Sequence, residues 1–437
     1  MSAEHELIVD AADPLAEISV YDGAFKRIGR GVGRLEGRFP DGLYEVRARL
    51  GGTVQEKLIS LDRDQSIRFE SVAFASAIPL AGTSTADSAH QAAVARALAN
   101  PKPLGSGSGL LVVVRDRPYK NSTPPPQGSS PAAGLALIAP DGSTILDVGG
   151  EAQVDRSGDA PVAAVYAEVD PGTYRLRIDR PDGGGRERAL IASPGWRTQC
   201  FMMRRWIREH ALADLDRGSV SIAASGSPFG PRDERVRLAE AARDALVSHR
   251  RIADAAARSL MKLKFEDPML GLLVAHLLLR DNPGARVLAT VRRNLVRLLG
   301  PAHPDVQAVN LGSSEELAAP VADMPMLRAS WDRIVEHSLT RPLLVPAASP
   351  AGEAATRVLP CGPWLVWRPA DVGGRADSKM AVLDSYMRNL AKSRPQATRG
   401  LIAPATLDEG ARAELAQSLA VPGQVLDAMI ARLRRGG

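Results

Sequence analysis

The stretch DGLYEVRARLGG, residues 41–52, alternates between apolar and polar side chains with a period of two. Tyr44 and Val46 fall on one side of an extended chain, and the charged residues between and after them fall on the other. This alternation is typical of a half-buried strand in an antiparallel sheet. Because two glycines end the stretch and permit a tight reversal, it predicts a strand that leads into a β-hairpin.

A similar piece returns later in the chain as PGTYRLRIDRPDGGG, residues 171–185. In both copies a turn precedes a Gly-x-Tyr triplet, formed by Gly42 and Tyr44 in the first and by Gly172 and Tyr174 in the second. An alternating strand that carries arginine follows, and a glycine-rich reversal leads to another strand. One supersecondary unit that recurs once at a long period predicts tandem domains and not a solenoid.

These two hairpins resemble the closing hairpin of PEGA-type and carboxypeptidase-regulatory-type β-sandwich modules. In those modules a proline or aspartate, a glycine and a tyrosine precede a strand of alternating residues. The modules are usually non-catalytic spacers or binding domains, so the resemblance implies the same for both copies. It also implies that Tyr44 and Tyr174 are structural, with the ring in the core and the hydroxyl held by a loop.

The whole chain predicts an α+β multidomain protein. Its 437 residues exceed one core of ordinary size, and its 39 Gly and 32 Pro indicate many turns. Strand-like patterns fill the N-terminal half, and apolar residues at helical spacing follow from about residue 216. We expect two tandem antiparallel β-sandwich modules and then a mostly helical domain. The expected parts are module 1 (1–85), a helix and flexible GSGSG linker (86–107), module 2 with a Pro-rich insertion (108–215), and the helical domain (216–437) with an irregular Pro/Gly segment (342–376).

Charge and cysteine content favour a cytoplasmic protein. The net charge of +5 comes mostly from dispersed arginines, which does not single out a nucleic-acid or membrane patch. Cys200 and Cys361 lie far apart, without metal-ligand spacing or a disulfide framework. The N-terminus lacks the apolar segment of a secretion signal, and the most apolar run, residues 269–279, is too short for a transmembrane helix.

No motif in the sequence predicts a reaction, a cofactor or a metal site. The glycines of IGRGVGRLEG, residues 28–37, precede a strand and turn pattern, whereas a dinucleotide loop requires a helix there. No HExxH, CxxC, GxSxG or P-loop pattern is present. We therefore expect a non-enzymatic adaptor or scaffold of a bacterial-type cytoplasm that binds another protein. Its oligomeric state stays open.

Trp364, Trp367 and Arg368, in the stretch GPWLVWRP, are the candidate partner-binding residues. Exposed tryptophans beside an arginine would be candidate hot spots for a protein partner. Buried tryptophans would instead anchor the β and helical halves to each other, and we favour burial.

Two alternative functions remain open at this point. The order of His337 and Cys361 is that of caspase-like peptidases, which suggests a cysteine peptidase-like enzyme. The stretch RAELAQSLAVPGQVLDAMIARLRR, residues 412–435, resembles a helix-turn-helix with a basic end suited to phosphate, which suggests a nucleic-acid-associated regulator.

Overall fold

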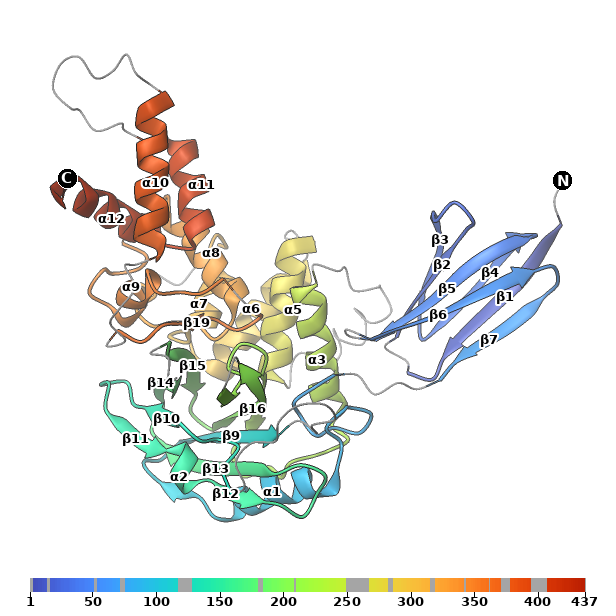
Figure 1. Cartoon of the computed structure of the whole chain (residues 1–437), viewed down its shortest axis with the longest axis horizontal. Coiled ribbons are helices and arrows are strands. Elements are labelled where there is room, and N and C mark those ends of the chain that lie inside the picture. The colour runs from blue at the N-terminus through green and yellow to red at the C-terminus, as the bar shows by residue number, and fades with distance from the viewer. Residues whose placement is uncertain are drawn as a thin grey trace.

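The protein is an α+β multidomain chain in which one β-sandwich stands to the side of a larger body (Figure 1). The body stacks a second sandwich beneath a group of helices. The computed structural model describes residues 3–13, 16–50, 53–70, 75–116, 128–179, 184–207, 210–248, 267–281, 286–314, 319–341, 343–360, 362–370, 378–393 and 407–436.

The first sandwich consists of two layers that enclose one core. Strand order β6-β5-β2-β3 forms one layer and β4-β1-β7 the other, and the pair Val32–Arg34 joins them. Neighbouring strands are antiparallel except for β1 and β7. The strands are β1 (Glu4–Ala11), β2 (Glu17–Tyr21), β3 (Arg27–Val32), β4 (Arg34–Pro40), β5 (Gly42–Leu50), β6 (Thr53–Leu61) and β7 (Gln65–Phe69).

Alternation explains why these short segments become strands. Tyr44, Val46 and Ala48 of β5 point into the core, where they pack with side chains of the opposite layer such as Leu7 and Val9. The sequence had indicated no strand at β1, although its Leu7 and Val9 are fully buried. The glycine-rich stretch IGRGVGRLEG lies in β3 and β4, which places it within a sheet.

The second sandwich also has two sheets around its own core. A five-stranded sheet has the order β11-β10-β14-β15-β19, and a larger sheet has the order β12-β13-β9-β16-β17, with β18 beside β16 and β8 beside β13. Cys200 lies on β16 as a fully buried core residue, and burial raises the pKa of its thiol. The elements are β8 (Lys102–Pro103), β9 (Ser108–Asp116), β10 (Leu135–Ile138), β11 (Thr144–Asp147), α2 (Val148–Glu151), β12 (Gln153–Asp155), β13 (Val162–Val169), β14 (Gly172–Ile178), β15 (Arg186–Ala192), β16 (Trp196–Ile207), β17 (His210–Ala213), β18 (Ser219–Ala224) and β19 (Val366–Trp367).

The two sandwiches share one four-stranded unit with the same strand order. In the first, β2 and β3 form a hairpin, β5 pairs with β2, and β6 pairs with β5. In the second, β10 and β11 form the hairpin, β14 pairs with β10, and β15 pairs with β14. The repeated sequence therefore corresponds to a repeated sheet, β6-β5-β2-β3 in one copy and β15-β14-β10-β11 in the other.

The segment between the sandwiches packs onto the second one, which corrects the expected flexible linker and the expected module end at residue 85. Ile78 and Leu80 are buried with helix α1 (Ser88–Ala99) against β9 and β13. The backbone N–H of Ser106 donates to the Asp170 carboxylate at 2.9 Å, and Gly107 accepts from the N–H of Gly195 at 2.8 Å. The GSGSG stretch is thus a fixed connection into β9, and the first sandwich ends with β7.

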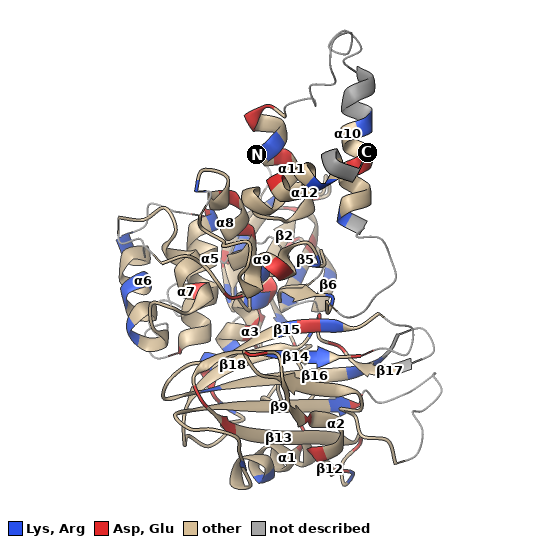
Figure 2. Ribbon diagram, turned by 90° about the vertical axis from the view of Figure 1, so that its left-hand side faces the viewer, with Lys and Arg blue, Asp and Glu red and all other residues tan. Residues whose placement is uncertain are grey.

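The C-terminal part is mainly helical and shares one large core with β15 and β18. Figure 2 shows helices of this part on one side of the second sandwich and α1 on the other. The segment 342–376 is less irregular than expected, because it contains helix α9. The helices are α3 (Glu234–Val247), α5 (Pro268–Asp281), α6 (Arg286–Leu299), α7 (Pro304–Asn310), α8 (Arg328–Ser338), α9 (Pro350–Ala355), α10 (Ser378–Ser393), α11 (Glu409–Leu419) and α12 (Gly423–Gly436).

Within the described residues, none of the helices combines the length and the apolar character needed to cross a membrane.

Candidate functional site

Trp364 and Trp367 lie in the contact between the second sandwich and the helices. Their side chains are 0% and 1% exposed. The indole N–H of Trp364 donates to the carbonyl of Gly218 at 2.5 Å, and that of Trp367 donates to the carboxylate of Glu187 at 2.7 Å. The two rings therefore anchor the halves to each other. This burial is the alternative that the sequence favoured, and it corrects the candidate assignment of the two tryptophans as partner-binding residues; only the neighbouring Arg368 is exposed among the three.

A charged network that the sequence did not indicate surrounds this contact. The Arg188 guanidinium stacks over the Trp364 ring at 4.8 Å and donates to the carbonyl of Leu215 at 3.1 Å. Burial lowers the pKa of Arg188. On α3, the Glu240 carboxylate accepts from Ser76 at 2.6 Å and from Ser219 at 2.7 Å. Because Ser76 precedes the second sandwich and Ser219 begins β18, this network joins three segments that are distant in sequence.

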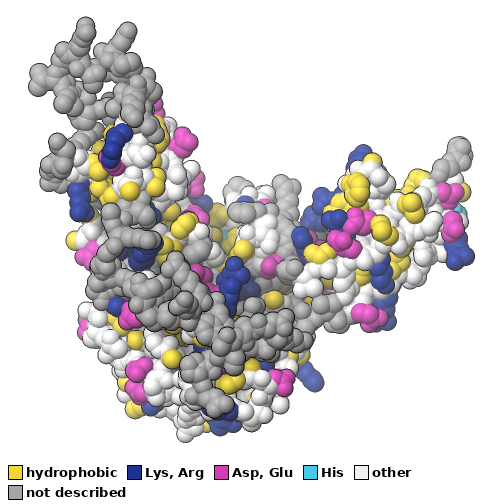
Figure 3. All heavy atoms as spheres, in the orientation of Figure 1, with side chains coloured by type: hydrophobic (Ala, Val, Ile, Leu, Met, Phe, Trp, Pro, Cys, Tyr) yellow, Lys and Arg dark blue, Asp and Glu magenta, His cyan; other side chains and the backbone are white. Residues whose placement is uncertain are grey.

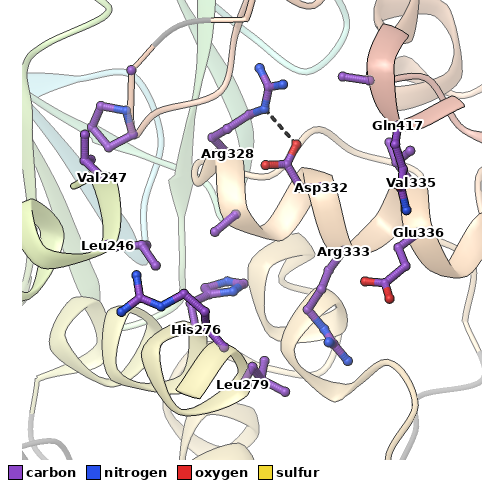
Figure 4. Close-up of a pocket in the computed structure, with 15 residues that line it drawn as sticks. Leu246, Val247, His276, Leu279, Arg328, Asp332, Arg333, Val335, Glu336 and Gln417 are labelled. Carbon is purple, nitrogen blue, oxygen red and sulfur yellow. Dashed lines mark hydrogen bonds and ion pairs between the residues drawn. The ribbon is translucent and has the colours of Figure 1, made fainter. Parts of the chain in front are cut away.

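The helical part contains a cavity of about 770 Å³ between α3 and α5 on one side and α8 and α11 on the other (Figure 4). On α5, His276 makes a 2.8 Å hydrogen bond to the hydroxyl of Ser330. Burial and the nearby Arg333 lower the pKa of His276 to about 3, so the ring is neutral at pH 7. Ser330 is itself fully buried, and no carboxylate contacts His276 within the described residues. The pair joins two helices, but its serine is inaccessible and its imidazole has no third group to orient it, as an activated nucleophile requires.

Arg328 and Arg333, which line this cavity, donate their hydrogen bonds to other groups of the chain. Arg328 donates to Asp332 and to the carbonyl of Leu359, each at 2.8 Å (Figure 4 shows the first contact). Arg333 donates to the carbonyls of Ala308 and Leu311. These contacts close loops onto α8 and leave the cavity without an evident anion site.

His337 and the neighbours of Cys361 lie at opposite ends of α8. Cys361 itself is outside the described residues. The backbone N–H of Arg328, at the start of α8, donates to the carbonyl of Pro363 at 2.9 Å. His337 lies nine residues further along the helix, a rise of roughly 14 Å. The geometry of the described residues thus gives no support to a Cys361–His337 dyad.

Helices α11 and α12 form the helical pair that the C-terminal sequence indicates. Arg412 and Asp427 link them through an ion pair of 2.7 Å, and Ala420 at the turn accepts from the indole N–H of Trp331 at 3.0 Å. The exposed positions on the described part of α12 are Asp427, Ala428, Ala431 and Arg432. These described positions combine one acid, two alanines and one arginine, so they offer no row of phosphate contacts. The side chains of Arg434 and Arg435, in the basic end, lie outside the described residues.

A trench of about 390 Å³ runs along the outer face of the first sandwich. Its floor includes Ser19 of β2, which lies directly between Arg30 of β3 and Arg47 of β5 in the sheet register. A small side chain between two long ones creates the hollow. The lining residues are Glu17, Ser19, Tyr21, Arg27, Arg30, Arg47, Arg49, Val54 and Glu56.

The trench has a surplus of positive charge, because four arginines and two glutamates line it. Arg47 pairs with Glu45 at 2.8 Å and with Glu56 at 3.3 Å, and it stacks over the Tyr21 ring at 4.8 Å. Arg27 and Arg49 are exposed, and neither pairs with an acid in the part of the chain that the structure describes. These two guanidinium groups are available to carboxylates of another molecule.

One end of the same sandwich is apolar. Leu58 and Leu43 are 83% and 68% exposed, and the register of β5 and β6 places them as diagonal neighbours. Phe25, in the turn between β2 and β3, is also exposed and holds a left-handed backbone with φ of 58°. Figure 3 shows basic, acidic and hydrophobic side chains together on the visible face of this sandwich. Strand alternation had indicated the outward arginines of β5, but not that β3 would add two more.

Tyr44 and Tyr174 are structural, as the resemblance implied. Each ring is nearly fully buried in its own core. The hydroxyl of Tyr44 donates to the carbonyl of Pro40 at 2.6 Å, and that of Tyr174 donates to the carbonyl of Asp170 at 3.0 Å. Both acceptors lie four residues upstream: Pro40 is the last residue of β4, and Asp170 follows β13, so each bond holds the turn that enters the strand.

The described residues contain no cluster of three or more His, Cys, Asp or Glu side chains that could hold a metal ion. The fold and these surfaces define a two-sandwich protein with a helical part and an uncovered, arginine-lined trench.

Comparisons with known proteins add little to this description. No protein-family model matches the chain. No curated protein matches it either. A solved protein of the DUF3823 family from Parabacteroides merdae aligns with 11% identity over 44% of this chain and 98% of its own length, at a TM-score of 0.15. That score is too low to support an argument, so the fold is assigned from the chain's own strands and cores.

Proposed function

We propose that this chain is a non-enzymatic adaptor of a bacterial-type cytoplasm, and that its first sandwich binds an acidic surface of a protein partner. The trench between β3 and β5 is the contact site. Arg27 and Arg49 bind carboxylates of the partner, and the exposed leucines at the end of the sandwich cover an apolar side chain.

One observation carries the proposal. The first sandwich stands beside the body (Figure 1). It exposes a trench with two arginines that lack an acidic partner within the described residues. The helices and the second sandwich, in contrast, use Trp364, Trp367 and the buried Glu240 of α3 to hold one another. The body is thus suited to support the first sandwich, and the first sandwich is suited to bind the partner.

Site-specific photo-crosslinking in the native cell tests the proposal. A benzoylphenylalanine replaces Tyr21, which lines the trench, or Thr290, an exposed control position on α6. We expect a discrete protein adduct from position 21 alone, and loss of that adduct in the Arg27→Gln, Arg49→Gln double variant. Adducts to nucleic acid only, or substrate turnover by the purified chain without any protein adduct, would refute the adaptor.

A further inference from the structure

The two copies of the repeated sheet differ at one edge. In the second copy, β15 is covered by β19, which pairs antiparallel through Glu187–Trp367 and Arg188–Val366. In the first copy, β6 is the corresponding strand, and β5 is its single neighbour among the described strands. An uncovered strand edge presents unpaired backbone groups that can pair with another extended chain.

The register shows which residues of the two edges correspond. Tyr44 lies opposite Ile59 in the first hairpin, and Tyr174 lies opposite Leu190 in the second. Three residues before Ile59 and Leu190 stand Glu56 and Glu187, and two residues before them stand Lys57 and Arg188. The two residues that receive β19 in the second copy therefore have counterparts of the same charge in the first.

Side chains at the covered edge show how the extended segment is recognised. The indole N–H of Trp367 donates to Glu187 at 2.7 Å, and the Trp364 ring stacks against Arg188 at 4.8 Å. An arginine of the preceding strand also lies near each glutamate: Arg177 is 4.0 Å from Glu187, and Arg47 is 3.3 Å from Glu56. Both edges thus carry a glutamate with an arginine beside it. Only the second copy, however, has a tryptophan-bearing segment paired with its edge.

The uncovered edge is accessible in the first copy. The Glu56 side chain is 53% exposed. Lys57 is directed toward the opposite layer, where its amine donates to the carbonyl of Arg68 at 2.7 Å and lies 5.2 Å from the centre of the Phe69 ring. Lysine often protects a free edge, but these contacts turn this one away from it. Next to the edge, Leu58 is exposed and offers apolar contact.

We infer that β6 binds an extended, tryptophan-bearing segment of the protein partner by antiparallel strand addition. A tryptophan of that segment donates its indole N–H to Glu56, in the way that Trp367 donates to Glu187. This inference rests on the proposed function, because it specifies how the partner engages the first sandwich. The neighbouring trench then receives acidic groups that flank the added strand.

A peptide with the sequence of residues 362–370, GPWLVWRPA, is the probe, because this segment already covers the equivalent edge. Its labelled form is titrated into the full-length chain, and hydrogen exchange of the chain is compared with and without peptide. We expect saturable binding and slower exchange of amides 53–61. We also expect at least a tenfold loss of affinity in Glu56→Ala, since a hydrogen bond to a charged group is removed.

Glu36→Ala is the matched control, because Glu36 is an exposed, ion-paired glutamate on the other layer. It should bind as the unaltered chain does, and GPALVARPA, which lacks both tryptophans, should bind at least tenfold more weakly. Unchanged affinity in Glu56→Ala, equal binding of the tryptophan-free peptide, or no protection of 53–61 would overturn the inference. Protection confined to β15 would show exchange with β19 and would overturn it as well.

The outcome is independent of the crosslinking result. If a partner crosslinks at position 21 but the peptide leaves β6 unprotected, the adaptor stands and strand addition fails. If the peptide protects β6 and no cellular protein crosslinks at the trench, strand addition stands and the proposed adaptor role fails.

Discussion

Tyr44 and Tyr174 hold corresponding loops in two separate cores. Each hydroxyl bonds a carbonyl four residues upstream, so each tyrosine fixes the loop that enters its strand. Only tyrosine supplies both the buried ring and the hydroxyl donor, because phenylalanine has the ring alone. The glycine two residues before each tyrosine begins the strand next to the ring.

Replacing either tyrosine with phenylalanine should destabilise its sandwich by about 1 kcal/mol, since the hydrogen bond from its hydroxyl to a part-buried carbonyl is lost. Urea denaturation of Tyr44→Phe and Tyr174→Phe measures the loss. Tyr21→Phe is the control, because Tyr21 contacts Arg47 through its ring. A loss as large in Tyr21→Phe as in the other two would show that the hydroxyl bonds of Tyr44 and Tyr174 contribute nothing specific.

Asp267 should make stability depend on pH in the acid range. Burial raises its pKa to about 6, although the N–H of Leu270 donates to its carboxylate at 2.8 Å. A carboxyl whose pKa is higher in the folded chain holds its proton more tightly there. Its stabilising contribution is therefore complete below the unfolded pKa of about 4 and is lost as the pH rises through about 6.

The variant Asp267→Asn lacks this titration but keeps an oxygen for Leu270. We expect the free energy of unfolding of the unaltered chain, relative to the variant, to fall by on the order of 2 kcal/mol between pH 4 and pH 7. Urea denaturation at several pH values measures the difference. A difference that stays constant over this range would contradict the raised pKa.

At the scale of elements, the sequence predicts strands and helices where a side-chain period is clear. The period of two in β5 and β14, and the helical spacing in α3, gave those elements correctly. Strand β1 was missed because only Leu7 and Val9 mark its inner face among acidic neighbours. The glycines of β3 similarly conceal a strand, since glycine carries no side chain whose burial could show a pattern.

The candidate sites could be predicted only in part, because they depend on register between strands. Alternation places Arg47 and Arg49 outward on β5. The trench also needs Arg30 of β3, which lies opposite Ser19 just as Arg47 does. Burial of Trp364 and Trp367 was favoured from sequence, yet their acceptors lie more than a hundred residues away. No local pattern specifies which distant backbone or carboxylate an indole will meet.

Strand β19 should determine how firmly the helices hold the second sandwich. Trp367→Phe removes the donor to the buried Glu187 and part of a fully buried ring. We expect a loss of about 2 to 4 kcal/mol in the free energy of unfolding, together with faster hydrogen exchange in β15. Arg368→Ala changes an exposed neighbour and should stay within about 0.5 kcal/mol. Equal effects of the two substitutions would mean that β19 contributes nothing specific to this contact.

At the scale of the whole molecule, the proposed binding surface lies apart from the body that would support it. The second sandwich and the helices share a core and the tryptophan contacts, so they unfold together in our interpretation. The first sandwich has a core of its own. An ion pair between Asp13, which follows β1, and Arg237 of α3 joins it to the body. Such a contact orients the first sandwich without burying the outer face that carries the trench.

Removing this ion pair should free the first sandwich to sample more orientations, because its hydrophobic core is separate from the cores of the body. In Arg237→Gln we expect small-angle scattering to show a broader distance distribution and a larger maximum dimension than in the unaltered chain. The circular dichroism spectrum should not change, since the core of each part is intact. Arg34→Gln is the control: it removes an exposed ion pair with Asp10 inside the first sandwich and should leave the scattering unchanged. If Arg237→Gln scatters as the unaltered chain does, other contacts fix the sandwich, and the trench is presented from a rigid arm.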